Sequence, residues 1–121
     1  MPYTDVEKRR AAVRAHYRAN KQVYKDRANA HRATQRKLLR ALILGYLAKH
    51  PCIDCGEADP VVLEFDHRNP KKKRFTVCYA VRQAYSVETV RRKISRCDVR
   101  CCNCHRRRTT QQFGWLTRIA A

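Results

Sequence analysis

The first 50 residues place apolar and polar side chains with the spacing of a nearly continuous helix. A narrow apolar stripe recurs at steps of seven, four, seven and four residues, formed by Val6, Val13, Tyr17, Tyr24 and Ala28. A stripe this narrow can lie on a partner surface but cannot build a core, so most of the helix should face water or a charged ligand.

Local signals predict both ends of this helix. Thr4 and Glu7 have the spacing of a capping box, and His50-Pro51 is a natural stop because the residue before proline disfavours the helical conformation. Near the stop the pattern becomes more apolar, and we expect these turns to dock on the rest of the chain, through Leu38, Leu39, Leu42, Ile43, Tyr46 and Leu47. This pattern divides the chain into a helical arm, residues 1–50, and a second domain, residues 51–121.

The second domain reads as a mixture of short strands and helices. Residues 61–65 and 75–79 have the composition of strands, joined by a turn that contains Asn69-Pro70 and a basic run. Ser86 is a suitable N-cap for a short helix with Val87, Val90 and Ile94 on one side, and a last helix should begin near Cys101. We therefore predict an α+β fold.

The charge of the chain restricts the class of partner. Its 121 residues carry 28 Lys and Arg against 10 Asp and Glu, a net charge of +18, and the arm alone has 13 basic and 3 acidic side chains. Such a charge repels itself unless a polyanion binds it, which favours nucleic acid. The basic segment has no strong apolar face for lipid, no run is apolar enough to span a membrane, and the first residues lack a secretory signal. We expect no membrane partner and a cytoplasmic location.

The seven cysteines fit a metal site better than disulfides. Cys52-x-x-Cys55 and Cys101-x-x-Cys104 are two knuckles that can hold one structural zinc through four thiolates, and a domain of about 70 residues needs such a staple. An odd number of cysteines and a reducing compartment both argue against a disulfide framework. An alternative pairing stays open, because Cys102-x-x-His105 also has ligand spacing and Cys97 lies close enough to compete.

Three further residues have chemistry that the zinc does not need. Asp66 and His67 end an apolar strand, and His105 follows the last cysteine on a helix. If one zinc ties the strand to the helix, these side chains can converge. Metal-assisted cleavage of a phosphodiester needs such a set, with ligands for a divalent cation and a neutral imidazole that takes a proton from water.

At this point the chain resembles the small zinc-stapled HNH endonucleases of bacteriophages and bacteria. The resemblance covers residues 52–111 and rests on Cys52-x-x-Cys55-Gly56, Leu63-Glu64-Phe65-Asp66-His67-x-x-Pro70 and Cys101-x-x-Cys104-His105-Arg106. It implies a ββα-metal finger in which Asp66 and His105 bind one catalytic Mg2+, Mn2+ or Ni2+ ion and His67 is the general base. It also implies DNA as substrate, with 5′-phosphate and 3′-hydroxyl products, and a phage setting in which packaging or terminase proteins are possible partners.

Basic side chains on both sides of these motifs are expected to contact phosphate. They are Lys71, Lys72, Lys73, Arg74, Arg106 and Arg108. With the helical arm they would grip the backbone of double-stranded DNA without reading bases, so we expect low sequence specificity and a monomer or weak dimer.

One position departs from the family pattern. The middle Asn of these nucleases braces the loop of the general base, and Arg96 stands at its place here. Asp98 and a backbone carbonyl are the two candidates for orienting the His67 ring instead.

Two other hypotheses for the function stay open. One is a non-catalytic zinc-ribbon DNA-binding protein that acts in regulation or packaging, and the other is an RNA-binding zinc protein.

Overall fold

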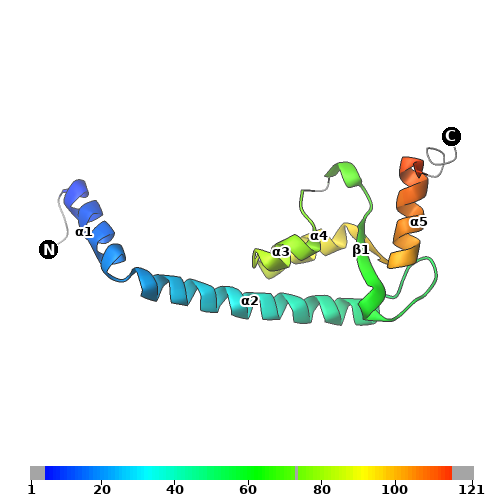
Figure 1. Ribbon diagram of the computed structural model, residues 1–121, viewed down its shortest axis with the longest axis horizontal. Coiled ribbons are helices and arrows are strands. Elements are labelled where there is room, and N and C mark those ends of the chain that lie inside the picture. The colour runs from blue at the N-terminus through cyan, green and yellow to red at the C-terminus, as the bar shows by residue number, and fades with distance from the viewer. Residues whose placement is uncertain (1–4, 73, 116–121) are drawn as a thin grey trace. The chain divides into compact units, whose positions relative to one another are not determined.

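The computed structural model describes residues 5–72 and 74–115. The arm is two helices rather than one: α1 spans Val6–Ala19 and α2 spans Lys21–Lys49 (Figure 1). The expectation of a nearly continuous helix is therefore wrong at Asn20. The Asn20 side chain donates a hydrogen bond of 2.9 Å to the carbonyl of His16, as short polar side chains do when they compete with the helical backbone.

The start of α1 also differs from the prediction. Its N-cap is Asp5, whose carboxylate accepts a hydrogen bond of 2.9 Å from the backbone N–H of Glu7. Thr4, the expected cap, lies outside the described residues. The predicted stop at His50-Pro51 is confirmed, because α2 ends at Lys49.

The chain forms two compact units, Met1–Thr34 and Gln35–Ala121, and the boundary falls inside α2. In the first unit the Tyr17 and Tyr24 rings lie 5.5 Å apart between centroids, while Val6 and Val13 remain exposed. No buried side chain is found in α1. From residue 5 to residue 34, this unit has the expected apolar stripe and no buried side chain.

The last turns of α2 belong to the second unit, as their apolar pattern predicted. Leu39 is fully buried in a cluster with Val77, Ala80, Val90 and Ile94. Further along the helix, Leu47 packs in a second cluster with two strand residues, Leu63 and Val99, and with three cysteines, Cys52, Cys101 and Cys104. The end of α2 is therefore part of the core that supports the site.

The sheet of the second unit is an antiparallel pair. Strand β1 spans Leu63–His67 and β2 spans Cys97–Cys101, with Leu63 opposite Cys101 and His67 opposite Cys97. A short 3-10 helix, Pro60–Val62, precedes β1, and a second, Pro70–Lys72, follows it. The predicted strand at residues 61–65 is thus found two residues later, and β2 was not predicted.

The second predicted strand, residues 75–79, is wrong. Thr76 is instead the N-cap of helix α3, Val77–Arg82, and its hydroxyl accepts a hydrogen bond of 3.0 Å from Tyr79 N–H. Val77 and Ala80 are buried three residues apart, which is helical spacing. These residues form a helix rather than a strand because the helix buries Val77 and Ala80 together against Leu39.

Two more helices complete the unit. Helix α4, Val87–Ser95, begins at the predicted N-cap Ser86, and α5, Cys102–Phe113, begins where the last helix was expected. Helix α5 contacts both strands, α4 contacts β2, and α3 contacts α4. The order is β1, α3, α4, β2, α5, a helix-rich mixed fold in which two helices separate the paired strands.

Within the described ranges, no helix has both the length and the apolar character needed to cross a membrane.

Candidate metal centres

Four cysteines gather at one end of the sheet. The Sγ atoms of Cys52, Cys55, Cys101 and Cys104 all lie within 4.8 Å of one another, and those of Cys55 and Cys101 are 3.7 Å apart. Tetrahedral zinc with Zn–S bonds of about 2.3 Å separates its sulfur ligands by about 3.8 Å. The cluster therefore has the donor set and the spacing to hold a metal such as zinc.

Local backbone structure brings each pair of thiols together. In the first knuckle, Gly56 N–H donates to the carbonyl of Cys52 at 2.9 Å, and Gly56 has a φ of +79°, which glycine adopts without strain. In the second, Cys101 ends β2 and caps α5, so that Cys104 lies in the first turn, with its N–H 3.4 Å from the Cys101 sulfur. The two knuckles thus join the sheet to α5.

The protonation of these thiols also suits a cation. Burial alone would raise the pKa of Cys52, but the backbone N–H groups of Cys101, Cys55 and Asp54 lower it from 9.0 to about 6. The neighbouring Cys101 thiol and burial raise the pKa of Cys104 to about 12. Thiolates this close repel one another, so full deprotonation of the cluster requires a bound positive ion.

The competing ligands lie outside this cluster. The Cys97 thiol is buried and donates to the carbonyl of Lys93 at 3.3 Å, and burial raises its pKa. Cys102 is exposed, and His105 bonds to Glu64. The structure therefore favours the Cys52, Cys55, Cys101 and Cys104 set over the alternative pairing.

A second group of polar side chains lies where β1 meets α5. Alternation along β1 puts Glu64 and Asp66 on the same face of the strand, towards α5. There, Oδ1 of the buried Asp66 is 3.5 Å from His105 Nε2, and Glu64 Oε2 is 2.6 Å from His105 Nδ1. Of the three side chains predicted to converge, Asp66, His67 and His105, the structure brings Asp66 and His105 into contact.

These contacts determine what His105 can do. An ionised carboxylate only accepts hydrogen bonds, so Glu64 selects the tautomer with the proton on Nδ1 and leaves the Nε2 lone pair directed towards Asp66. Histidines that bind metals almost always donate their other N–H to a carboxylate in this way. Adjacent ligands of one divalent ion with bonds of about 2.1 Å lie about 3 Å apart. Asp66 Oδ1 and His105 Nε2 therefore fit one shared cation.

The other oxygen of Asp66 is held by two arginines. Asp66 Oδ2 accepts hydrogen bonds from Nη1 of Arg100 at 2.9 Å and from Nη1 of Arg108 at 2.7 Å. Arg100 is buried and also bonds to Asp54 at 2.8 Å. Burial opposes its charge, but Asp54 and Asp66 outweigh burial and raise the pKa of Arg100. This network fixes the Asp66 carboxylate.

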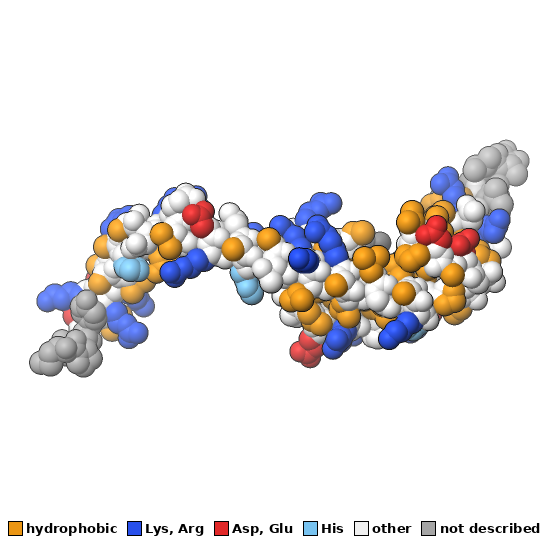
Figure 2. Space-filling view, turned by 90° about the horizontal axis from the view of Figure 1, so that it is seen from below, with side chains coloured by type: hydrophobic (Ala, Val, Ile, Leu, Met, Phe, Trp, Pro, Cys, Tyr) orange, Lys and Arg blue, Asp and Glu red, His pale blue; other side chains and the backbone are white. Residues whose placement is uncertain are grey.

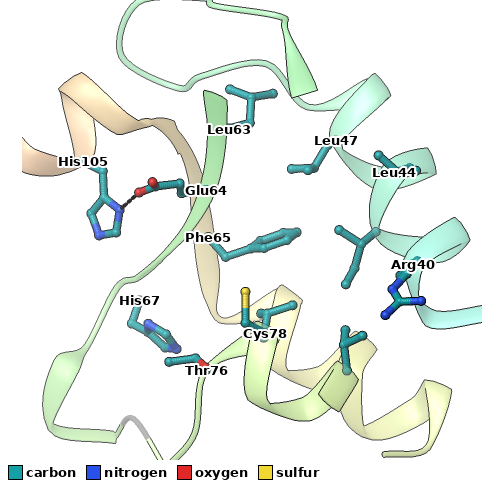
Figure 3. A pocket seen from close by; sticks show the side chains of 13 residues that line it. Arg40, Leu44, Leu47, Leu63, Glu64, Phe65, His67, Thr76, Cys78 and His105 are labelled. Atoms are coloured by element: carbon teal, nitrogen blue, oxygen red, sulfur yellow. Dashed lines mark hydrogen bonds and ion pairs between the residues drawn. The ribbon is translucent and has the colours of Figure 1, made fainter. Parts of the chain in front are cut away.

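His67 lies at the end of β1 and lines a pocket of about 670 Å³. Figure 3 shows Glu64 and His105 joined on one side of this pocket, His67 below them on the same side, and Phe65 nearer the centre. The remaining wall is mostly apolar and comes from α2, α3 and β1, through Ile43, Leu44, Leu47, Leu63, Val77 and Val81. Glu64, His67 and His105 therefore open onto one cavity.

Hydrogen bonds fasten the chain just after His67 to the residues around Arg96. Arg68 N–H donates to the carbonyl of Arg96 at 3.2 Å, and the Arg68 guanidinium donates to Asp98 at 2.9 Å and to the carbonyl of Ser95 at 2.9 Å. Asp98, one candidate for orienting His67, bonds to Arg68 and Arg100. Arg96 thus supports this turn through its backbone rather than its side chain.

The predicted phosphate contacts fall into two groups. Lys71, Lys72, Arg74 and Arg106 are exposed, whereas Lys73 lies outside the described residues. Arg108 instead points inward and bonds to Asp66 and to the carbonyl of His67, the latter at 3.2 Å. Figure 2 shows Lys and Arg side chains over the surface of the chain and few acidic ones.

The sequence interpretation gave no role to Glu64 and Arg100. For Glu64 a signal exists, since it stands two residues before Asp66 on a predicted strand and must share its face. For Arg100 the signal was absent, because β2 itself was not predicted.

The chain matches no protein-family model, no curated protein and no solved structure. The resemblance to HNH endonucleases therefore rests on the sequence motifs.

Proposed function

We propose that this protein is a metal-dependent HNH endonuclease that hydrolyses DNA phosphodiester bonds. The observation that supports this most is the pair of Asp66 Oδ1 and His105 Nε2, 3.5 Å apart, with Glu64 bonded to the opposite nitrogen of the same ring. A carboxylate and an oriented imidazole on adjacent elements form a ligand pair for a divalent cation. We further propose that zinc occupies the cysteine cluster, where it holds α5 against the sheet.

In this proposal each residue has a separate role. Asp66 and His105 hold Mg2+, Mn2+ or Ni2+, which would neutralise charge on the phosphate during attack. His67 accepts a proton from the attacking water, for which a neutral imidazole is suited near physiological pH. Arg100 and Arg108 keep the Asp66 carboxylate in place.

The basic surface supplies affinity rather than specificity. Residues 5–34 carry nine basic and three acidic side chains on helices that are almost entirely exposed. Contacts of this kind go to phosphates, which are the same for every sequence. Cleavage should therefore show low sequence preference, and binding should weaken steeply with salt.

The direct test is cleavage of supercoiled plasmid by the purified full-length protein. After a chelator wash too mild to remove thiolate-bound metal, we expect relaxed or linear product on addition of Mg2+, Mn2+ or Ni2+. Relaxed product indicates nicking and linear product indicates cutting of both strands. DNA binding without cleavage in any of the three metals would contradict the proposal.

Glu64→Gln should weaken binding of the catalytic metal while leaving the fold intact. The amide can donate to Nδ1 and thereby favour the wrong tautomer, and loss of such a carboxylate partner typically costs 10- to 100-fold in metal affinity or activity. The measurement is the Mn2+ concentration that gives half-maximal cleavage. Glu7→Gln is the matched control, since Glu7 is an exposed carboxylate paired with Arg14 at 2.8 Å and its change removes the same charge.

A non-catalytic zinc-stapled DNA-binding protein is the second candidate function. It is favoured by the two guanidinium groups on Asp66 Oδ2, which already compensate the buried carboxylate. In this case Glu64, Asp66 and His105 would serve as a structural bridge between β1 and α5. Mn2+ would then bind no more tightly to wild type than to Glu64→Gln.

A further inference from the structure

A small polar hollow lies between α4 and the residues just before α3. Its volume is about 260 Å³, and it is lined by Lys72, Arg74, Phe75, Thr89, Arg92, Lys93 and Arg96. Five of these side chains are cationic, and none of the described lining residues is acidic. The hollow therefore concentrates positive charge in a small concave space.

Two contacts within the described residues involve cations of this hollow. Lys93 is 7% exposed, and its Nζ lies 4.7 Å above the centroid of the Phe75 ring. Arg92 pairs with Glu88 at 3.6 Å, but both side chains are mostly exposed, which makes the pair weak. The negative end of the α4 dipole favours cations in its last turn. The dipole of α4 does not explain why Lys72 and Arg74, which belong to another segment, line the same hollow.

We propose that this hollow is a phosphate-binding pocket. Lysine and arginine donate to phosphate oxygens, and a guanidinium can do so through two parallel hydrogen bonds. The Thr89 hydroxyl lies 2.7 Å from the Ser86 hydroxyl and adds a neutral donor when Ser86 donates within that pair. The proposal rests on nucleic acid being the partner of the protein, but it does not require cleavage. The phosphate can be an internal phosphodiester or a terminal phosphate, since both present the same oxygens.

The position of the hollow links it to the candidate catalytic group. Arg96 directly precedes β2, whose first residue, Cys97, pairs with His67 across the sheet. The carbonyl of Arg96 also accepts the hydrogen bond of Arg68, the residue after His67. A phosphate held here would fix the path of a nucleic-acid strand near the end of β1, where His67 lies.

A titration with inorganic phosphate tests the pocket without DNA or cleavage. In NMR spectra of the zinc-loaded full-length protein, we expect saturable shifts of the guanidinium N–H signals of Arg74, Arg92 and Arg96. Arg82 and Arg91 are exposed arginines of α3 and α4 outside the hollow and should shift little. Equal shifts in both groups would overturn the proposal, whether or not the protein proves to be a nuclease.

Matched double variants test the pocket with nucleic acid. Arg92→Ala/Arg96→Ala and Arg82→Ala/Arg91→Ala remove the same charge, so a general electrostatic effect predicts equal losses. We expect the first pair to flatten the slope of log K against log salt by about 0.9, the value for one lost phosphate contact, and the second to change it less. Equal changes would contradict a specific pocket. Duplexes with and without a 5′-phosphate identify the source: a terminal phosphate improves wild-type binding only if the pocket takes a strand end.

Discussion

Cys101→Ser should release the metal of the cysteine cluster and unfold much of the second unit. Cys101 is buried in the same cluster as Leu47, Leu63 and Val99, ends β2 and caps α5, so its loss affects sheet, helix and metal together. Binding of a structural zinc contributes on the order of 10 kcal/mol, comparable to the whole stability of a small domain. The measurements are zinc content per protein and the thermal unfolding transition followed by circular dichroism.

The neighbouring cysteine supplies a matched control. Cys102→Ser makes the same chemical change one residue later, at an exposed position outside the four-thiol cluster. It should keep one zinc and unfold at the wild-type temperature. Zinc retention by Cys101→Ser together with zinc loss by Cys102→Ser would instead support the pairing of Cys102 with His105.

The sequence predicted best those parts of the fold that local chemistry determines. The spacing of the cysteines defined a cluster that the structure brings together, and Ser86 marked the start of α4 correctly. The strand predicted at residues 75–79 failed because Phe75, Val77 and Tyr79 alternate like a strand. Burial against Leu39, 38 residues before Val77, selects a helix there, and no local pattern contains that contact.

The candidate site shows the same division between local and long-range information. Asp66 and His105 were identified from motifs, and their approach follows from two knuckles that join strand to helix. The roles of Glu64, Arg100 and Arg108 depend on the register of β1 and β2 and on the face of α5. Such pairings join residues more than 30 positions apart, so no local pattern shows them. From its charge alone Arg108 was predicted to contact phosphate, whereas in the structure its guanidinium bonds to Asp66.

His67→Ala should abolish most cleavage while leaving folding, zinc and DNA affinity close to wild type. In the proposed mechanism His67 accepts the proton of the attacking water and binds no metal, so its loss affects the chemical step alone. Removal of a general base typically lowers the rate by about a hundred- to ten-thousand-fold. The measurement is the single-turnover rate of plasmid relaxation at saturating Mn2+, with protein in excess of DNA.

His31→Ala is the control variant, and DNA binding is measured for both variants beside the rate. His31 is an exposed histidine of α2 in the first unit, and its replacement should leave the rate unchanged. If His67 merely closed the pocket wall beside Phe65, its loss would lower the unfolding temperature and reduce rate and binding together. A large fall in rate at constant zinc content, melting temperature and salt-dependent affinity is the pattern that only a role in proton transfer explains. Full activity of His67→Ala would exclude that role and turn the search for the base to another residue of the same pocket.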